Sequence, residues 1–396
     1  MKNHFFAHQA QTTPYPLAIE IERAEGVWLY GPEDRKYIDL ISGIAVNNIG
    51  HCHPKVVKAV QEQAAKYMHV MAYGEYVQAP QAGFAAKLAS VLPDTLDCVY
   101  FTNSGTEATE GALKLAKRAT GRSHIVSFKK SYHGSTHGSL SVTGNETKKY
   151  AFRPLLPNVS FIAFNEETEL DAITKQTACV IMETIQGDAG VRIPSMAFMQ
   201  ALRKKCTETG ALLILDEIQT GFGRTGKLFA FEHFGIVPDI LTIGKAMGGG
   251  MHMGGFVSSR NLMHELTFNP ILGHITTFGG HPVACAAGLA GLEVVLEEKL
   301  VDSCEEKGAW LEEQLHHPLV KEIRRKGMMF AIEMENANVV QQVVSRCLEN
   351  GAITFWFLSC PESFRLAPPL TISRAESEIA VGIIREAMDH VLTHPQ

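Results

Sequence analysis

The sequence predicts an α/β fold organised around a mostly parallel sheet. From about residue 46 to about residue 290, short apolar runs typical of strands alternate with helical patterns. This alternation indicates βαβ units with helices on both faces of the sheet. A chain of 396 residues is too long for one simple core. We predict a large domain over 46–290, a smaller C-terminal α+β domain over 291–396, and a lead-in segment over 1–45 that packs with the small domain.

The predicted elements follow in order along the chain. The lead-in is expected to be extended, with a hairpin around Gly31-Pro32-Glu33-Asp34. Helices are predicted over 107–119 and over 195–210, where Ser195 can cap the first turn and Gly210 can end the helix. The predicted strands of the large domain are 98–103, 125–128, 159–164, 178–184, 211–217, 240–244 and 254–258.

The C-terminal part mixes helices with a strand. A helix is expected from Ala290 onward, a strand near 328–334 and a helix from Asn338. The last helix opens with the capping box formed by Ser373 and Glu376. Its expected apolar face is made of Ile379, Ile383 and Ala387.

One lysine stands at the carboxyl end of the predicted strand 240–244. Lys245 follows this apolar run and precedes the small residues of 246–250. An ammonium there is poorly solvated, and desolvation lowers a lysine pKa from about 10.4 and leaves a nucleophilic amine. Such amines form Schiff bases with carbonyl substrates and with pyridoxal phosphate. Because most lysines are solvated surface charges, a second signal is needed.

The second signal is an acid at the end of the preceding predicted strand. The apolar run 211–215 ends in Asp216 and Glu217. In open α/β sheets ligands bind outside the carboxyl ends of the strands. A pyridoxal phosphate enzyme needs a carboxylate that keeps the pyridine nitrogen protonated. Asp216 is the candidate, and the alternative is an ordinary strand-end Asp that caps the next segment.

A glycine-rich loop follows the same strand and resembles nucleotide-binding motifs. Residues 221–226 satisfy G-x-G-x-x-G, and 221–227 approach a P-loop. Leu228 stands where a P-loop needs Ser or Thr. Pro238 follows too soon for a long helix. We therefore reject both interpretations.

A turn between the strand 98–103 and the helix 107–119 predicts an anion site. Free backbone N–H groups and the helix dipole favour negative charge at such a terminus. The candidates for holding a cofactor phosphate are Ser104, Gly105 and Thr106. The alternative is an ordinary helix cap by Ser104 or Thr106.

With these residues in place, the chain resembles the class III pyridoxal-phosphate-dependent aminotransferases, the ornithine, acetylornithine and 4-aminobutyrate type. The resemblance spans nearly the whole chain and implies fold type I. The matching stretches are 43–54 (GIAVNNIGHCHP), 103–108 (NSGTEA), 131–134 (SYHG), 183–190 (ETIQGDAG), 215–226 (LDEIQTGFGRTG), 244–250 (GKAMGGG), 277–282 (TFGGHP) and 364–369 (FRLAPP).

The resemblance assigns roles by position around the cofactor ring. Lys245 matches the Schiff-base lysine and proton shuttle, and Asp216 matches the partner of the pyridine nitrogen. Tyr132 and Ile218 match the residues on the two ring faces. Gln219 matches the residue near the phenolic oxygen.

The resemblance also covers the phosphate and the substrate. Gly105 and Thr106 match the phosphate loop, and Glu183 lines the same pocket. Thr277 matches a hydroxyl that reaches the phosphate from the neighbouring subunit, so a homodimer is implied. Arg365 matches the arginine that binds a substrate carboxylate, a geometry that suits guanidinium groups.

Three positions depart from the family pattern. Ser135 replaces the arginine that often follows the aromatic-His-Gly triplet, so a second carboxylate clamp is missing. Asp188 replaces the Glu that switches Arg365 on and off, and it is one methylene shorter. It is interpreted as a salt-bridge gate, a second base or a polar loop residue. His281 replaces the usual Asn before Pro282 and is interpreted as a turn substitution.

Composition points to an ordinary cytoplasmic protein that binds small molecules. The net charge of −6 offers no basic footprint for nucleic acid. The basic pairs Lys129-Lys130, Lys148-Lys149 and Arg324-Arg325 are interpreted as solvated. The N-terminus has no apolar core of signal-peptide length, and no run reaches the length of a membrane span. The eight cysteines form no C-x-x-C and are expected to be reduced.

A metal site is not expected. His51 and His53 flank Cys52, and His133 and His137 are four apart, but neither group has a third ligand at standard spacing. His133 is instead placed beside the cofactor.

We therefore expect a ping-pong transaminase that binds pyridoxal 5'-phosphate, takes an ornithine- or acetylornithine-like ω-amino donor, and uses a 2-oxo acid such as 2-oxoglutarate as acceptor. One alternative is an amino-acid racemase or epimerase that uses Lys245 and Asp188. The other is a non-catalytic relative, which the joint presence of Lys245, Asp216 and Thr106 disfavours.

Overall fold

The structure is a computed structural model that describes residues 1–394. Its large sheet has seven strands in the order β4-β10-β9-β8-β7-β5-β6. Strand β10 runs antiparallel to β4 and β9, and the other pairs are parallel. All seven predicted strands are confirmed, at Cys98–Thr102 (β4), His124–Phe128 (β5), Val159–Ile162 (β6), Thr177–Glu183 (β7), Leu212–Asp216 (β8), Ile240–Gly244 (β9) and Gly254–Ser258 (β10).

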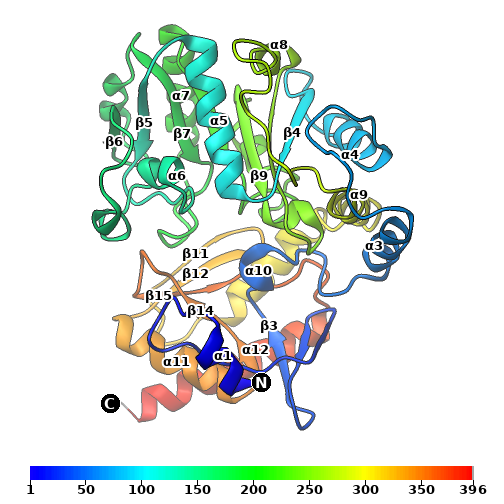
Figure 1. Cartoon of the computed structure of the whole chain (residues 1–396). Helices are drawn as coiled ribbons and strands as arrows, with labels where there is room; N and C mark the ends of the chain where they lie inside the picture. The colour runs from blue at the N-terminus through cyan, green and yellow to red at the C-terminus, as the bar shows by residue number, and fades with distance from the viewer. Residues whose placement is uncertain (395–396) are drawn as a thin grey trace.

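Helices cover both faces of this sheet (Figure 1). Successive side chains of a strand point to opposite faces, and on β7 Ile181 packs into the apolar cluster on one face while Met182 packs into the cluster on the other. Helix α5 belongs to the first face and α7 to the second. The helices of this part are Pro54–Lys66 (α3), Ala79–Ala89 (α4), Gly105–Thr120 (α5), His137–Val142 (α6), Met196–Thr209 (α7), Arg260–His264 (α8) and Pro282–Glu297 (α9).

The two helices predicted in this region have the expected ends. Ser104 caps α5, and its hydroxyl accepts the Glu107 N–H at 3.3 Å. Ser195 caps α7, and Gly210 ends it in the left-handed conformation that glycine adopts easily. The short 3-10 helices are Glu146–Lys148 (η1), Tyr150–Phe152 (η2), Glu167–Ala172 (η3), Ala230–Phe234 (η4) and Lys245–Gly248 (η5).

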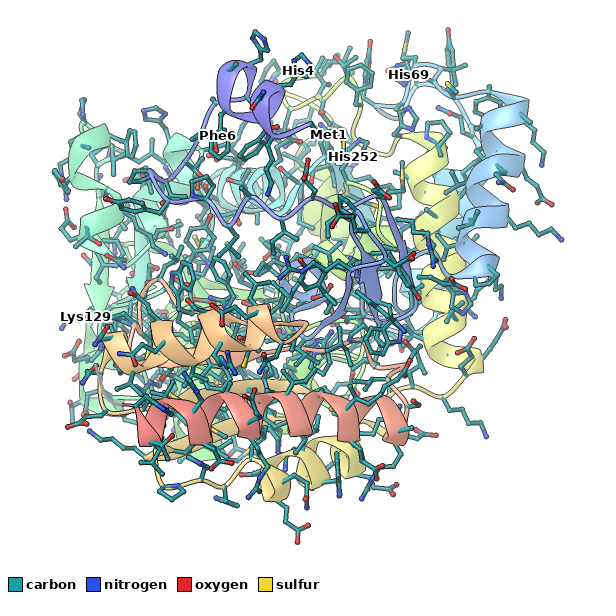
Figure 2. All side chains as sticks on the ribbon, turned by 90° about the horizontal axis from the view of Figure 1, so that it is seen from below. Met1, His4, Phe6, His69, Lys129 and His252 are labelled. Atoms are coloured by element: carbon teal, nitrogen blue, oxygen red, sulfur yellow. The ribbon has the colours of Figure 1, made fainter. Side chains whose placement is uncertain are left out.

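The C-terminal part forms a smaller α+β unit. Its antiparallel sheet has the order β11-β12-β15-β14. Helices α11 and α12 lie side by side (Figure 2), and α11 packs against β14 and β15. The elements are Cys304–Gln314 (α10), Glu322–Lys326 (β11), Met329–Glu333 (β12), Ala337–Glu349 (α11), Ala352–Ile353 (β13), Phe355–Trp356 (β14), Ser363–Leu366 (β15) and Arg374–Thr393 (α12).

The N-terminal segment is more structured than predicted. It begins with helix α1 (Lys2–His8), whose residues are mostly exposed and which stands out from the body in Figure 2. The expected hairpin joins β2 (Trp28–Tyr30) to β3 (Lys36–Asp39), and β1 (Arg23–Glu25) and α2 (Ser42–Ala45) flank it. Strand β3 also pairs with β13 of the C-terminal unit. The domain limits at residues 45 and 290 remain a proposal. The limit at residue 290 falls inside helix α9 and does not coincide with the end of an element.

The C-terminal part differs from the sequence analysis in three features. Strand β11 was not predicted, because four of its five residues are charged. The pair Arg324-Arg325 is not solvated, since both side chains are largely buried and form ion pairs with glutamates. On α12, the predicted Ala387 is buried and Ile383 is partly buried against the core, but Ile379 is exposed. The other buried apolar residues of this helix are Ala380, Val381, Ile384, Met388 and Val391.

The capping box of α12 is confirmed. The Ser373 hydroxyl accepts the Glu376 N–H, and the Glu376 carboxylate accepts the Ser373 N–H at 2.9 Å. No helix within residues 1–394 combines the length and apolar character needed to cross a membrane.

Candidate active site

The site lies where five strands of the large sheet end. The segments after β4, β5, β7, β8 and β9 meet around a cavity of about 250 Å³. Carboxyl ends of parallel strands form such crevices in open sheets. The predicted residues that line this cavity are Gly105, Thr106, Tyr132, His133, Glu183, Asp188, Asp216, Ile218, Gln219 and Lys245.

Lys245 follows β9 directly and faces this cavity. Its φ of 49° is unusual for a residue with a side chain, and such strain concentrates at functional positions. Burial lowers the pKa of its ammonium, and this effect outweighs the opposing influence of Asp216 and other carboxylates. The local structure thus favours a neutral amine.

Asp216 is held in a fixed orientation at the end of β8. Its Oδ2 accepts a hydrogen bond from Nδ1 of the buried His133 at 2.7 Å, and its Oδ1 accepts the Ile218 N–H at 3.0 Å. A carboxylate only accepts, so His133 carries its proton on Nδ1. His133 therefore fixes the orientation of the Asp216 carboxylate, a role that the sequence did not indicate.

Glu183 holds two loops of the site together. Its two oxygens accept the N–H groups of Tyr132 and Gly187, each at 2.9 Å. Burial raises the pKa of this carboxyl to about 7, and Asp216 adds to the rise while His133 opposes it. At Gly187 a Cβ would meet Oε1 of Gln219 at 2.1 Å, so any larger residue there would displace the Gln219 side chain.

The turn before α5 forms one end of the cavity. The Thr106 hydroxyl lies 2.6 Å from the Ser139 hydroxyl and 2.8 Å from that of Thr136. A Cβ at Gly134 would meet Oγ1 of Thr106 at 2.3 Å, so the loop must pass close to this hydroxyl. Hydroxyls at the N-terminus of a long helix suit a phosphate.

A second cavity of about 820 Å³ adjoins the first and shares with it Tyr132, Ser135, Asp188, Gln219 and Lys245. The Tyr132 hydroxyl lies 3.1 Å from the Ser135 hydroxyl. Much of the wall is apolar, from Ile41, Ile44, Leu140, Phe152, Phe355 and Leu358.

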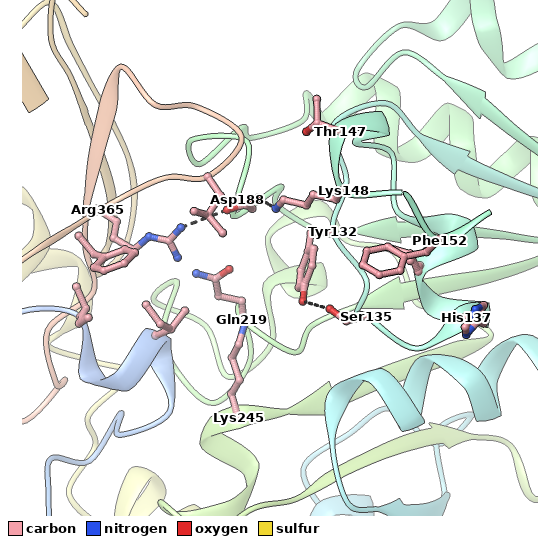
Figure 3. A pocket seen from close by; sticks show the side chains of 15 residues that line it. Tyr132, Ser135, His137, Thr147, Lys148, Phe152, Asp188, Gln219, Lys245 and Arg365 are labelled. Carbon is pink, nitrogen blue, oxygen red and sulfur yellow. Dashed lines mark hydrogen bonds and ion pairs between the residues drawn. The ribbon is translucent and has the colours of Figure 1, made fainter. Parts of the chain in front are cut away.

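Charged side chains gather on one wall of this larger cavity (Figure 3). Arg365 projects from the buried strand β15 and donates to Asp188 at 3.3 Å. Lys148 and the Ser359 hydroxyl also donate to Asp188. Burial alone would raise the Asp188 pKa, but Lys148, Ser359 and Arg365 together lower it.

Lys148 is the site residue that the sequence analysis missed. It was interpreted as solvated, as was Lys149, and both interpretations were wrong. Lys148 faces the cavity from η1, and the buried Lys149 places its ammonium 4.0 Å from the centre of the Phe161 ring. A lysine pair in a loop has no periodicity that shows which way it points, so the sequence contained no usable signal.

Three other sequence features occupy different places. Thr277 is exposed on the segment between α8 and α9, and next to it Thr276 accepts a hydrogen bond from Asn103 at 2.9 Å. His281 precedes Pro282 at the start of α9 and stacks on His69. Residues 221–226 form turns, in line with the rejected nucleotide motifs.

One cluster outside the site has metal-ligand chemistry. Within the described part of the chain, Glu333, Cys360 and Glu362 place ligand atoms within 4.8 Å of one another. Arg324 forms an ion pair with Glu333 and lies 3.8 Å from the Cys360 sulfur. The guanidinium already supplies the positive charge there.

The fold and the site together define a pyridoxal-phosphate-dependent enzyme of fold type I. The family described as aminotransferase class-III matches residues 8–388. This chain therefore belongs to the class-III aminotransferases and is a transferase of amino groups.

Individual relatives agree with this assignment. The acetylornithine aminotransferase of Methanosarcina mazei is 41% identical over 366 residues, which cover 91% of this chain and 88% of the relative. The [LysW]-aminoadipate semialdehyde transaminase of Deinococcus radiodurans is 40% identical over 379 residues, or 94% and 86% of the two chains. A solved ornithine aminotransferase of Toxoplasma gondii superposes with a TM-score of 0.91 at 28% identity, covering 99% of this chain and 94% of that one.

Proposed function

We propose that this transaminase takes its amino group from the ω-carbon of an acetylornithine- or ornithine-like donor and delivers it to a 2-oxo acid such as 2-oxoglutarate. The observation that carries the proposal is the placement of Lys245 and Asp216 in one cavity, with Arg365 on the wall of the cavity beside it. The relatives named acetylornithine aminotransferase support the class of donor.

The residues present fit pyridoxal phosphate. Thr106 and the N-terminus of α5 suit the phosphate, and the Gly134 backbone leaves space beside them. Asp216 would face the ring nitrogen, with Tyr132 and Ile218 on the two ring faces. When bound, this cofactor supplies an electron-poor ring that accepts the electron pair released from the donor carbon.

The chain's own residues hold and move protons around that group. Asp216, fixed by His133, would keep the ring nitrogen protonated. Burial lowers the pKa of Lys245 and so favours the neutral amine. That amine would take the proton from the donor carbon and then deliver it to the cofactor. Glu183 holds the Tyr132 and Gly187 loops in place and so shapes the pocket.

The larger cavity would take the rest of the substrate. Its apolar wall suits the methylene chain of an ω-amino compound, and Arg365 suits a carboxylate. Ser135 offers a hydroxyl at the position where the family that the chain resembles often carries arginine. The remote carboxylate of the donor therefore needs another cation.

The racemase alternative finds no support in the three relatives described above, which are named as aminotransferases or transaminases. The geometry disfavours it as well. Asp188 is held by two cations and one hydroxyl, and its lowered pKa makes it a poor base for a carbon-bound proton.

A homodimer in which Thr277 reaches the neighbouring active site is also part of the proposal. Thr277 is exposed, and apolar side chains near it along the chain are exposed as well. The segment 72–78 also exposes apolar side chains, among them Val77, which is 99% exposed. Both segments border one cavity of about 360 Å³. Large exposed apolar areas mark interaction surfaces. Sedimentation of the purified protein tests the dimer, and Thr277→Ala should weaken cofactor binding without changing the sedimentation.

We further propose that the protein works in the cytoplasm. The cysteines are free, and six of the eight are buried. Free thiols persist in a reducing compartment.

The first test is spectroscopic. Cofactor-loaded protein is titrated with acetylornithine and then, in a fresh sample, with ornithine, in the absence of any 2-oxo acid. Loss of the visible absorption band on donor addition, and its recovery on addition of 2-oxoglutarate, is the expected result and ranks the two donors. A band unchanged by either compound would contradict the proposed donor class.

A further inference from the structure

Asp188 is bound more completely by Lys148 and Ser359 than by Arg365. Its Oδ2 accepts from both the Lys148 ammonium and the Ser359 hydroxyl, the latter at 2.6 Å. Its Oδ1 accepts a single hydrogen bond from Nη2 of Arg365, at 3.3 Å. This arrangement is not the bidentate pair that a guanidinium and a carboxylate form when they bind only each other.

Arg365 has N–H groups that are not used by Asp188. Its guanidinium carbon lies 4.3 Å from the centre of the Phe357 ring, so the ring covers one face and the edges remain for hydrogen bonds. Among residues 1–394, no group accepts a hydrogen bond from its buried Nε. A buried donor without an acceptor is costly, and a ligand oxygen would remove that cost.

The charges on this wall explain how a second carboxylate can bind. Lys148 and Arg365 carry two positive charges and Asp188 one negative charge, so the group has one positive charge in excess. A substrate carboxylate neutralises that excess. If Lys148 were absent, Asp188 and Arg365 would already be balanced, and a substrate carboxylate would add an uncompensated charge in a largely buried place, which is unfavourable.

We propose that Lys148 determines substrate specificity by neutralising Asp188, so that Arg365 receives a substrate carboxylate while Asp188 stays in place. The inference deepens the proposed function, on which it rests for the identity of the substrate. The substrate class is a carboxylic acid that places one carboxylate against Arg365.

The charge itself can be tested by removing and restoring it. The probe is pentanoate, an unreactive monocarboxylate, titrated into cofactor-loaded protein by calorimetry. The variants are Lys148→Met, Asp188→Asn and the double variant. Lys129→Met is the matched control, because Lys129 lies at the outer edge of the molecule (Figure 2) with a side chain that is 58% exposed. Lys148→Arg tests whether a different cation of similar reach is sufficient.

Lys148→Met is expected to weaken pentanoate binding by roughly tenfold to a hundredfold, as the loss of one nearby charge in a partly buried site predicts. Adding Asp188→Asn to it restores the excess positive charge and should return the affinity to within about threefold of the wild-type value, since the net charge is again the same. Lys129→Met should bind as the wild-type protein does. The KM for the 2-oxo acid should follow the same order, with kcat changed far less.

A double variant that binds as weakly as Lys148→Met would overturn the inference, because Lys148 would then act through shape and not through charge. Unchanged binding in Lys148→Met would overturn it as well. Charge-dependent rescue in a protein that fails to transfer amino groups would support this inference and contradict the proposed function, so the two failures are distinguishable.

Discussion

Asp216→Asn is the change that best isolates the contribution of one charge at the active site. Asparagine has nearly the same shape, and its side-chain oxygen can still accept the Ile218 N–H. The imidazole of His133 can move its proton to Nε2 and accept from the new amide, but among residues 1–394 no group accepts a hydrogen bond from the buried Nε2. The fold should therefore lose about 1–3 kcal/mol, the cost of a buried donor without an acceptor.

The effect on catalysis should be larger. A carboxylate about 4 Å from a protonated ring nitrogen contributes about 4 kcal/mol at an effective dielectric constant of about 20. Because the Asp216 side chain is only 4% exposed, solvent provides little screening. If the full interaction is lost in the transition state, kcat falls about a thousandfold.

The assay is steady-state transamination with saturating donor, 2-oxo acid and added cofactor. Asp239→Asn is the matched control. Asp239 lies just before the first residue of β9, at the end of the strand away from Lys245, and it pairs with Arg203. Thermal unfolding of both variants shows whether the fold is intact. A kcat for Asp216→Asn within about tenfold of the wild-type value, with cofactor bound, would refute the assigned role of this carboxylate.

Three further predictions concern the cofactor site and stability. Lys245→Ala should abolish both turnover and the visible absorption of the loaded protein, and near wild-type turnover would contradict its role. Gly134→Ala should weaken cofactor binding about tenfold or more in equilibrium titration, because its Cβ would meet the Thr106 hydroxyl. Burial lowers the pKa of His233 to about 4; the unfolded chain then binds more protons between pH 4 and 6.5, so stability present above that window is lost as pH falls through it. His233→Gln should remove about 1 kcal/mol of that loss between pH 7 and 5, after allowance for partial exposure, as measured by urea unfolding.

The parts of the fold that depend on local pattern could be predicted from the sequence. The seven strands of the large sheet are runs of apolar residues bounded by turns, and burial on both faces leaves such runs little freedom to be anything else. The caps Ser195 and Ser373 accept from backbone N–H groups three residues further on, and Gly210 ends α7 by its own left-handed conformation, so these signals are local too.

Position along those strands also predicted much of the candidate site. Asp216 is the last residue of β8, and Lys245 and Thr106 follow the ends of β9 and β4. Strands that run in the same direction in one sheet bring such positions to one edge. The resemblance then assigned them roles, which remain proposals for this chain. What the pattern could not show was the contact between His133 and Asp216, which are 83 residues apart.

Two features were decided only by tertiary structure. The rotation of α12, which buries Ile384 and exposes Ile379, depends on how the helix packs against α10 and α11, and the two isoleucines are equally apolar in the sequence. The position of Lys148 depends on how a turn folds back over the cavity, since a long flexible side chain in a loop can point to solvent or to protein. The sequence by itself determined the sheet, the helix ends and the residues at the strand ends, because those follow from neighbours along the chain. The charge balance around Arg365 was decided by tertiary structure, because it joins residues 148, 188, 359 and 365 that are neighbours only in space.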